Sequence, residues 1–370
     1  MSAAQTVPLK TASKIQLEGF EYVQLRVGNA YQTMHFFRTL YGFAPVAYSG
    51  LETGNRNFTA FLLGQGKIRL LITTPSDPSS VAASEINLRG DGVSELAFRV
   101  ANVEETYHLA LSRGAVPLSD PSITEDDFGS VMTASILSGS GVVHSFVHLD
   151  NYAGAFAPGF RPLPLATSSY SPGLLELDHV ALSLPRGELD KGAAFYTDVL
   201  DMTVTHQEDL TTPYSAMGSK VVQNQNGTVK FSMMEPRPGQ RTSQIEEYLK
   251  YNHGPGVQHL AFSCSDIVNT VQTLMNAGVE FLAPPPAYYD LLPERVGAIG
   301  QTIPALREVG VLADRDEWGY LLQIFSKAIS SRPTLFMEII QREGSRGFGS
   351  GNIRALFVAL EREQALRGNL

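Results

Sequence analysis

Two histidines and one glutamate of this chain have the residue types of a metal site. His179 lies in the stretch LLELDHVALSL, His259 in GPGVQHLAF and Glu338 in RPTLFMEIIQ. Each stretch mixes apolar and polar residues as a half-buried strand does. Two imidazoles and one carboxylate on three strands could form the facial triad that leaves open coordination positions on Fe(II). Each residue alone could equally be an ordinary core or surface residue, so their joint placement decides between the two interpretations.

The two histidines occupy equivalent points of an internal repeat. The stretch LEGFEYVQLRV aligns with LLELDHVALSL and puts Tyr22 at the position of His179. In the same way, GDGVSELAF aligns with GPGVQHLAF and puts Glu95 at the position of His259. The two separations are 157 and 164 residues, so the halves stay in register apart from a short insertion. We therefore expect one half to bind the metal and the other half to serve as scaffold.

The elements that must position these residues also repeat. In each half the predicted order is a strand, a helix, further strands, a second helix and a final strand. The helices are expected over 34–46, 103–118, 193–205 and 267–282. The intervening and final strands are expected over 62–73, 140–149, 226–236 and 318–327. This order predicts an α+β fold of paired βαβββ modules with a curved sheet in each half. A stretch rich in Pro, Gly, Ser and Ala predicts a linker over 151–173, between domains at 1–150 and 174–370.

Composition excludes several classes of partner. The 370 residues carry a formal charge of -9 with acidic and basic residues mixed, which favours a small-molecule ligand over nucleic acid or a membrane surface. The single cysteine, Cys264, allows no intrachain disulfide, and residues 1–16 contain no apolar signal segment. We expect a soluble, cytoplasmic protein. The remaining histidines are expected to be structural: His35, His108, His144, His148, His206 and His253.

Several long blocks in order resemble the 4-hydroxyphenylpyruvate dioxygenase family of the vicinal oxygen chelate superfamily. These blocks are SQIEEYL, GPGVQHLAF, DRDEWGYLLQIFSK and RPTLFMEIIQREGSRGFGSGNIRALFVALEREQ, and the resemblance covers essentially the whole chain. It implies two tandem vicinal oxygen chelate domains, the second an open curved barrel around Fe(II) bound by His179, His259 and Glu338. It also implies an aromatic 2-oxo acid and O2 as substrates, and a homo-oligomer.

The resemblance further implies a substrate pocket. Its polar positions match Ser219, Gln244, Gln258 and Gln323, its aromatic wall and gate match Phe325 and Phe348, and Asn352 and Ile353 lie in its carboxyl-terminal stretch. Uncharged amides and a hydroxyl can orient a phenol or keto acid without competing for the metal. Residues 352–370 are expected to form an amphipathic helix that closes over the site.

Two departures from the dioxygenase pattern concern which product is formed. The dioxygenases usually read Pro-x-Asn-Glu-Pro where this chain has SMMEP, and Gly-Asn-Phe where it has Gly-Asn-Ile. The changes at Ser232, Met234 and Ile353 remove an amide and a flat ring, which should let the substrate ring swing and bring its benzylic carbon nearer the oxidant. This pattern is similar to the hydroxymandelate-forming branch. The stretches GKIRLLIT and VGNAYQTMHFF look more like the homogentisate-forming branch, so homogentisate is the alternative product.

Three other classes share a duplicated chain of this kind. An extradiol ring-cleaving dioxygenase would be expected to carry a His or Tyr acid-base pair beside the metal, and a glyoxalase-type isomerase would be expected to use more than one carboxylate ligand. A metal-free binding module would not need two histidines and a glutamate at these points. The residues favour the dioxygenase that acts on a chelating 2-oxo acid.

Overall fold

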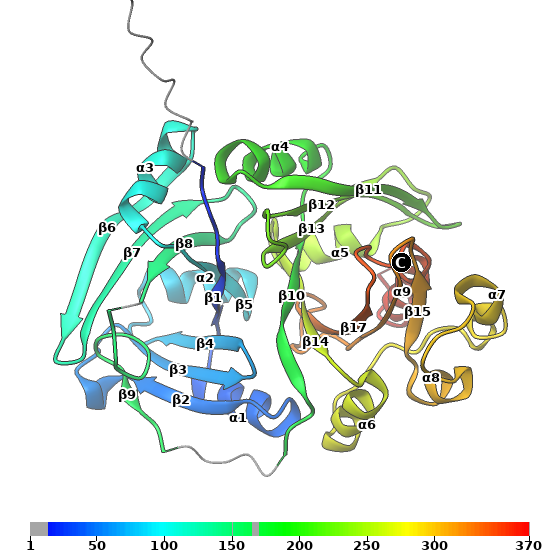
Figure 1. The fold of residues 1–370 in the computed structure, drawn as a ribbon, viewed down its shortest axis with the longest axis horizontal. Coiled ribbons are helices and arrows are strands. Elements are labelled where there is room, and N and C mark those ends of the chain that lie inside the picture. The colour runs from blue at the N-terminus through cyan, green and yellow to red at the C-terminus, as the bar shows by residue number, and fades with distance from the viewer. Residues whose placement is uncertain (1–13, 150, 165–169, 370) are drawn as a thin grey trace, which may run out of the picture.

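The computed structural model describes residues 14–149, 151–164 and 170–369 (Figure 1). Residues 1–13, residue 150, residues 165–169 of the predicted linker and the final residue of the predicted closing helix lie outside the described part. Within the described part, no helix is both long and apolar enough to cross a lipid bilayer.

Each half of the chain forms one curved sheet with its own helices, seen side by side in Figure 1. The elements of the first half are β1 (Gly19–Arg26), α1 (Ala30–Leu40), β2 (Ala44–Ser49), β3 (Phe58–Gln65), β4 (Ile68–Pro75), α2 (Val81–Arg89), β5 (Gly92–Arg99), α3 (Val103–Ser112), β6 (Val116–Asp126), β7 (Gly129–Leu137), β8 (Val143–His148) and β9 (Arg161–Pro162).

The second half repeats this series and adds helices near its end. Its elements are β10 (Leu174–Ser183), α4 (Leu189–Ala194), a π-helical turn (Phe195–Val199), β11 (Thr203–Thr211), β12 (Ala216–Gln223), β13 (Lys230–Arg237), α5 (Gln244–Tyr251), β14 (Gly256–Cys264), α6 (Ile267–Ala277), α7 (Leu292–Val296), α8 (Ile303–Val309), β15 (Leu312–Arg315), β16 (Tyr320–Phe325), β17 (Phe336–Glu343) and α9 (Ser350–Leu366).

The two sheets have the same strand order. The first runs β6-β7-β8-β5-β1-β4-β3-β2-β9, and the second, read from its other end, runs β15-β16-β17-β14-β10-β13-β12-β11. Apart from the short β9, every strand of one sheet has its counterpart in the other. The predicted α+β fold of paired βαβββ modules is therefore confirmed, since each half is two such modules joined through β1 and β5 or through β10 and β14.

Alternation along the strands separates a shared core from two barrel interiors. Val23 on β1 and Val180 on β10 face one continuous apolar core that includes both halves. Tyr22 and His179, each one residue earlier, face the interiors of their own barrels, where separate apolar clusters line the walls. The position of a residue in the strand therefore decides whether it stabilises the protein or lines a barrel.

Some elements differ from the predicted ones. The single strand expected over 62–73 is a hairpin of β3 and β4, because Gly66 adopts a φ of +55° in a tight turn. The helix expected over 193–205 ends in the π-helical turn, and β11 begins at Thr203. Helices α2, α5, α7 and α8 had no predicted counterpart.

The domain boundaries at 1–150, 151–173 and 174–370 remain predictions, but the described part of the linker is partly folded. Phe156 is buried against the inner face of the first sheet, and Pro162 on β9 pairs with β2. By these contacts, the beginning of the predicted linker packs with the first half.

His144 lies fully buried where the two halves meet. Its Nε2 is 2.9 Å from the hydroxyl of Tyr196, and its ring stacks on Phe231 of β13, so it joins β8 to the second half. Burial lowers the pKa of His144 from 6.5 to about 4, because the imidazolium would lose its hydration there. The neutral ring is thus built into the junction between the halves.

We predict that protonation of His144 destabilises the protein in mild acid. The pKa is lower in the folded state, so the stabilisation is complete above pH 6.5 and is lost as the pH falls toward 4. The loss should reach roughly 2 kcal/mol between pH 7.5 and pH 5, measured as the shift of the urea unfolding transition. His144→Gln should reduce the pH dependence of the free energy of unfolding, whereas His35→Gln, which changes an exposed residue of α1, should not. An equal acid shift in His144→Gln would refute the assignment.

Candidate functional site

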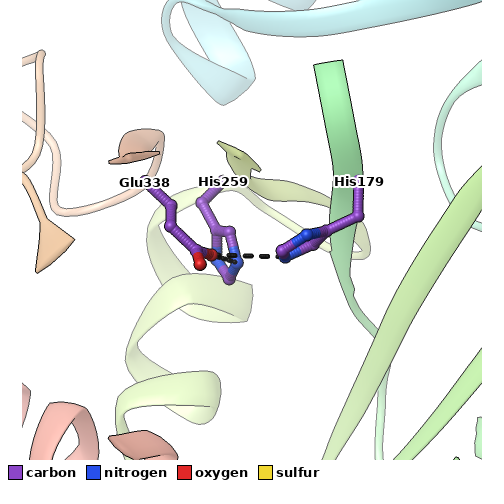
Figure 2. Close-up of side chains that lie close together, drawn as sticks. All are labelled: His179, His259 and Glu338. Atoms are coloured by element: carbon purple, nitrogen blue, oxygen red, sulfur yellow. Dashed lines mark ion pairs between the residues drawn. The ribbon is translucent and has the colours of Figure 1, made fainter. Parts of the chain in front are cut away.

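Three adjacent strands of the second sheet bring His179, His259 and Glu338 together. Strands β10, β14 and β17 are neighbours, and Ala261 of β14 pairs with His179 on one side and with Glu338 on the other. His259 lies two residues before Ala261, so its side chain leaves the same face of the sheet. Figure 2 shows the three side chains converging inside the barrel.

A bulge in β14 places an extra side chain beside the histidine. Ala181 pairs with His259 and Leu182 with Val257, so Gln258 has no partner of its own on β10. The bulge brings the Gln258 amide oxygen to 3.2 Å from Nδ1 of His259. The sequence repeat did not reveal this irregularity, which the first half reproduces between Gln24 and Leu25.

The geometry of the cluster fits a metal ion. Nε2 of His179 and Nε2 of His259 lie 3.2 and 3.3 Å from the same carboxylate oxygen of Glu338, and the three possible ligand atoms lie within 4.8 Å of one another. All three side chains are buried. The other oxygen of Glu338 has no hydrogen-bond partner among the described residues. A buried carboxylate with a free oxygen, facing two imidazole nitrogens, is a donor set suited to a divalent cation.

Neighbouring polar groups orient both imidazoles. Nδ1 of His179 lies 2.9 Å from Asp178, whose carboxylate accepts two hydrogen bonds from Arg342, at 2.7 and 2.9 Å. Nδ1 of His259 contacts Gln258, whose amide donates to Gln244 at 2.6 Å. A ring that donates through Nδ1 presents the lone pair of Nε2 to the centre, which is the tautomer that binds a metal.

Glu338 and His259 have the charge states that metal binding requires at neutral pH, whereas at His179 the Glu338 and Asp178 carboxylates outweigh burial and raise the pKa, so a metal would have to displace that proton. Burial opposes ionisation of Glu338, but His179 and His259 outweigh it and lower the pKa of that carboxyl to about 2. Burial likewise opposes ionisation of Asp178, yet Arg342 and His179 hold its pKa well below the ordinary value. Burial lowers the pKa of His259 despite the nearby carboxylate, so this ring is neutral. An ionised carboxylate and a neutral imidazole are the forms that bind metals.

The cavity around the cluster contains most of the predicted pocket residues. It measures about 30 Å³ and is lined by the three proposed ligands together with the predicted residues Ser219, Ser232, Met234, Gln323, Phe325, Phe348 and Ile353. Met217, Ile340 and Leu356 also line it and were not predicted. Its remaining surface is thus mainly apolar and aromatic, with a few polar groups.

Three predicted substrate contacts lie elsewhere. Gln244 and Gln258 line a neighbouring cavity of about 210 Å³ between α5 and the end of α9. Asn352 is fully buried and accepts a hydrogen bond of 2.6 Å from the hydroxyl of Tyr288. Asn352 is not among the residues that line the cavity beside the metal cluster, whereas the next residue of α9, Ile353, is.

Two functional candidates escaped the sequence analysis. Asp178 immediately precedes His179, and this adjacency was an available signal. Arg342, on β17, was not distinguishable from a surface arginine. Its guanidinium lies 5.1 Å from the ring centre of Phe348 and donates to the carbonyl of Gly347 at 2.6 Å. It therefore connects the loop before α9 to the partner of His179.

None of the other histidines joins the cluster. His144 belongs to the junction between the halves. Nδ1 of His148 lies 3.1 Å from the backbone carbonyl of Val100, just after β5, and His206 lies 3.5 Å from Glu208 on β11. The one group of three or more metal-binding side chains in the described part of the chain is His179, His259 and Glu338.

Comparison with known proteins agrees with the fold. A model of the amino-terminal domain of hydroxyphenylpyruvate dioxygenase matches residues 12–154, and a model of the glyoxalase, bleomycin resistance protein and dioxygenase superfamily matches residues 176–324. The chain is 37% identical to 4-hydroxyphenylpyruvate dioxygenase of Yarrowia lipolytica, over 97% of this chain and 95% of that protein. It is 38% identical to probable 4-hydroxyphenylpyruvate dioxygenase 2 of Aspergillus fumigatus, over 97% of each.

A solved structure is similar over almost the whole chain. A triple mutant of 4-hydroxymandelate synthase from Streptomyces coelicolor superposes with a TM-score of 0.86 at 37% identity, covering 94% of this chain and 99% of that one. Membership of this group implies a non-haem metal, for which the cluster of two histidines and a glutamate is suited. The chain belongs to the 4-hydroxyphenylpyruvate dioxygenase family, and it is a dioxygenase built of two tandem vicinal oxygen chelate domains.

Proposed function

We propose that the protein binds Fe(II) through His179, His259 and Glu338 and converts 4-hydroxyphenylpyruvate and O2 into 4-hydroxymandelate and CO2. Two imidazoles and one carboxylate are a donor set that would hold Fe(II) and leave part of its coordination sphere open. When bound, such an iron centre supplies reductive activation of O2 coupled to loss of CO2 from the keto acid. The three side chains are buried, and a carboxylate faces two imidazoles, which supports this assignment.

The protein's own residues position the substrate and exclude water. Gln323 and Ser219 are uncharged polar groups in the cavity wall, suited to hydrogen-bond a phenol or keto acid. Phe325 and Phe348 supply flat apolar surfaces, and Phe348 packs edge-on against His179 with ring centres 5.0 Å apart. Asp178 holds His179 in the metal-binding tautomer through its bond to Nδ1.

Entry of substrate requires movement of the gate. A cavity of about 30 Å³ is far smaller than the roughly 300–1,000 Å³ of typical small-molecule sites. Phe348 and the α9 residues Ile353 and Leu356 form the wall that can retract, because they are carried by one loop and one helix. Arg342, bound to Asp178 and stacked on Phe348, is the contact that such a movement would have to rearrange.

The observation that carries the choice of product is the aliphatic wall of the cavity. Ile353, Met234 and Met217 pack together on one side of the metal cluster, and Ser232 lies nearby. No amide stands at position 234 and no flat ring at 353, so the substrate's ring is held less firmly. A shift of about 1 Å suffices to redirect such a reaction. We infer that the benzylic carbon receives the oxygen atom.

Homogentisate is the second candidate product. The relatives at 37–38% identity carry the name 4-hydroxyphenylpyruvate dioxygenase, which favours homogentisate as the product. The same substrates would give the same loss of CO2, with the oxygen delivered to the ring and the side chain migrating.

Product analysis tests the proposal. Enzyme loaded anaerobically with Fe(II) and then given 4-hydroxyphenylpyruvate and air should yield hydroxymandelate as the main product by chromatography. Homogentisate as the main product would reject the proposed product but keep the dioxygenase. Neither product, with iron bound, would reject 4-hydroxyphenylpyruvate as the substrate.

Restoring a flat ring should redirect the oxygen. Ile353→Phe should raise the ratio of homogentisate to hydroxymandelate by about tenfold, which corresponds to about 1.4 kcal/mol between the two transition states. Ile353→Leu, which keeps an aliphatic side chain, is the matched control and should leave the ratio near that of the parent. Equal ratios in all three proteins would contradict a steering role for this position.

Each of the three proposed ligands should be required for the protein to retain bound iron. His179→Ala, His259→Ala and Glu338→Gln should reduce bound iron after gel filtration from about one per chain to near zero, because two ligands hold a divalent ion poorly. His35→Gln, which changes an exposed histidine on α1, should retain full iron content. An active variant with full iron would refute the assignment of that ligand.

A further inference from the structure

The barrel of the first half contains a large cavity at the place that corresponds to the metal cluster. Its volume is about 550 Å³, against about 30 Å³ in the second barrel. Tyr22 pairs with Ala97, and Ala97 pairs with Ser145, as His179 and Glu338 pair with Ala261. Tyr22 lines this cavity. The duplication has thus preserved an inward-facing pocket after replacing its metal-binding residues.

A hydrogen-bonded pair stands where the second barrel has its two histidines. The hydroxyl of Tyr22 donates to a carboxylate oxygen of Glu95 at 2.7 Å. Ser145, at the position of Glu338, shares a hydrogen bond of 2.8 Å with Ser135. Burial and the Glu95 carboxylate raise the pKa of Tyr22 well above its ordinary value, so its hydroxyl keeps its proton. This side of the pocket is organised for hydrogen bonding.

The walls are suited to an aromatic ring. Leu71, Val131 and Val147 line the cavity from three strands. Phe156 and Phe160 close it from the segment that follows β8, and the ring of Phe156 meets that of Tyr22 edge-on at 5.4 Å. A volume of several hundred Å³, with apolar walls and a few convergent polar groups, is typical of small-molecule sites.

Tyr22 and Gln24, which line the cavity, each offer an acceptor oxygen to a hydrogen-bond donor. Because Tyr22 gives its proton to Glu95, its oxygen can only accept from a ligand. Gln24 donates to Ser94 at 3.1 Å, which leaves its amide oxygen able to accept as well. The negative charge of Glu95 close by disfavours an anionic head group at this end.

The remaining charges of the cavity are occupied. Arg26 is ion-paired with Glu85 of α2, and Asp77 accepts two hydrogen bonds from Ser79. Arg26 is therefore not available as a counter-ion for an anionic ligand at low cost, and Asp77 keeps a negative charge that disfavours an anion.

We propose that the first barrel is a second binding site, for an uncharged aromatic compound whose phenolic hydroxyl donates to Tyr22 and Gln24. The ring would lie among Leu71, Val131 and Phe156, and binding would be independent of the metal. This site is separate from the reaction proposed above, and its occupancy does not depend on which product is formed.

Calorimetric titration of the full-length, iron-loaded protein with 4-methylphenol and with 4-methylanisole tests the proposal. The two probes share the ring, but only the phenol can donate. Tyr22→Phe should weaken 4-methylphenol about tenfold, the loss expected for one hydrogen bond, and should leave 4-methylanisole unchanged. Because Tyr22 lies outside the catalytic barrel, turnover of the keto acid should also be unchanged, which shows that the variant is folded.

Two further variants locate the bound phenol. Ala157→Phe, which fills part of the same cavity from its half-buried closing segment, should abolish binding of both probes while turnover continues. His179→Ala, in the other barrel, should leave binding intact. The proposal is overturned if no heat of binding appears at millimolar phenol, if Ala157→Phe binds as well as the parent, or if only His179→Ala abolishes binding.

Discussion

A carboxylate buried between two imidazoles requires a compensating positive charge, and the second barrel is arranged around that requirement. Glu338 is almost fully inaccessible, and one of its oxygens faces Nε2 of both His179 and His259. The neighbouring histidines outweigh burial and hold the pKa of this carboxyl low, but its second oxygen has no partner among the described residues. Fe(II) at the common centre would satisfy all three groups at once. Because the cluster lies on three paired strands, their register determines its geometry.

The orienting groups connect this centre to the wall of the cavity at Phe348. Arg342 binds Asp178, which holds His179, and the same guanidinium stacks on Phe348 at the entrance. The proposed metal ligand His179 and the aromatic residue Phe348 therefore both contact the ion pair of Asp178 and Arg342. A movement of Phe348 that admits substrate would be felt at the hydrogen bond that orients the imidazole, which couples closure of the pocket to alignment of the metal site.

The sequence predicted the duplication, the order of strands and helices in each half and the three residues of the cluster, because alternation along a strand and repetition of a motif are local signals. It did not predict the hairpin at Gly66, although the polar and glycine residues Gly64–Lys67 between two apolar stretches were an available turn signal. It could not show the hydrogen bond from Tyr288 to Asn352, because the two residues are far apart in the sequence. The role of Arg342 depends on long-range contacts that leave no trace in a single sequence.

The same topology supports two different interiors, a compact one with a metal cluster and an open one with the Tyr22–Glu95 pair. The most direct test of this account is anomalous X-ray diffraction at the iron edge from crystals grown with Fe(II) under anaerobic conditions. The account predicts one strong peak per chain, about 2 Å from Nε2 of His179, Nε2 of His259 and a carboxylate oxygen of Glu338, and none beside Glu95. A peak elsewhere, or none at this cluster in protein that retains iron, would contradict it.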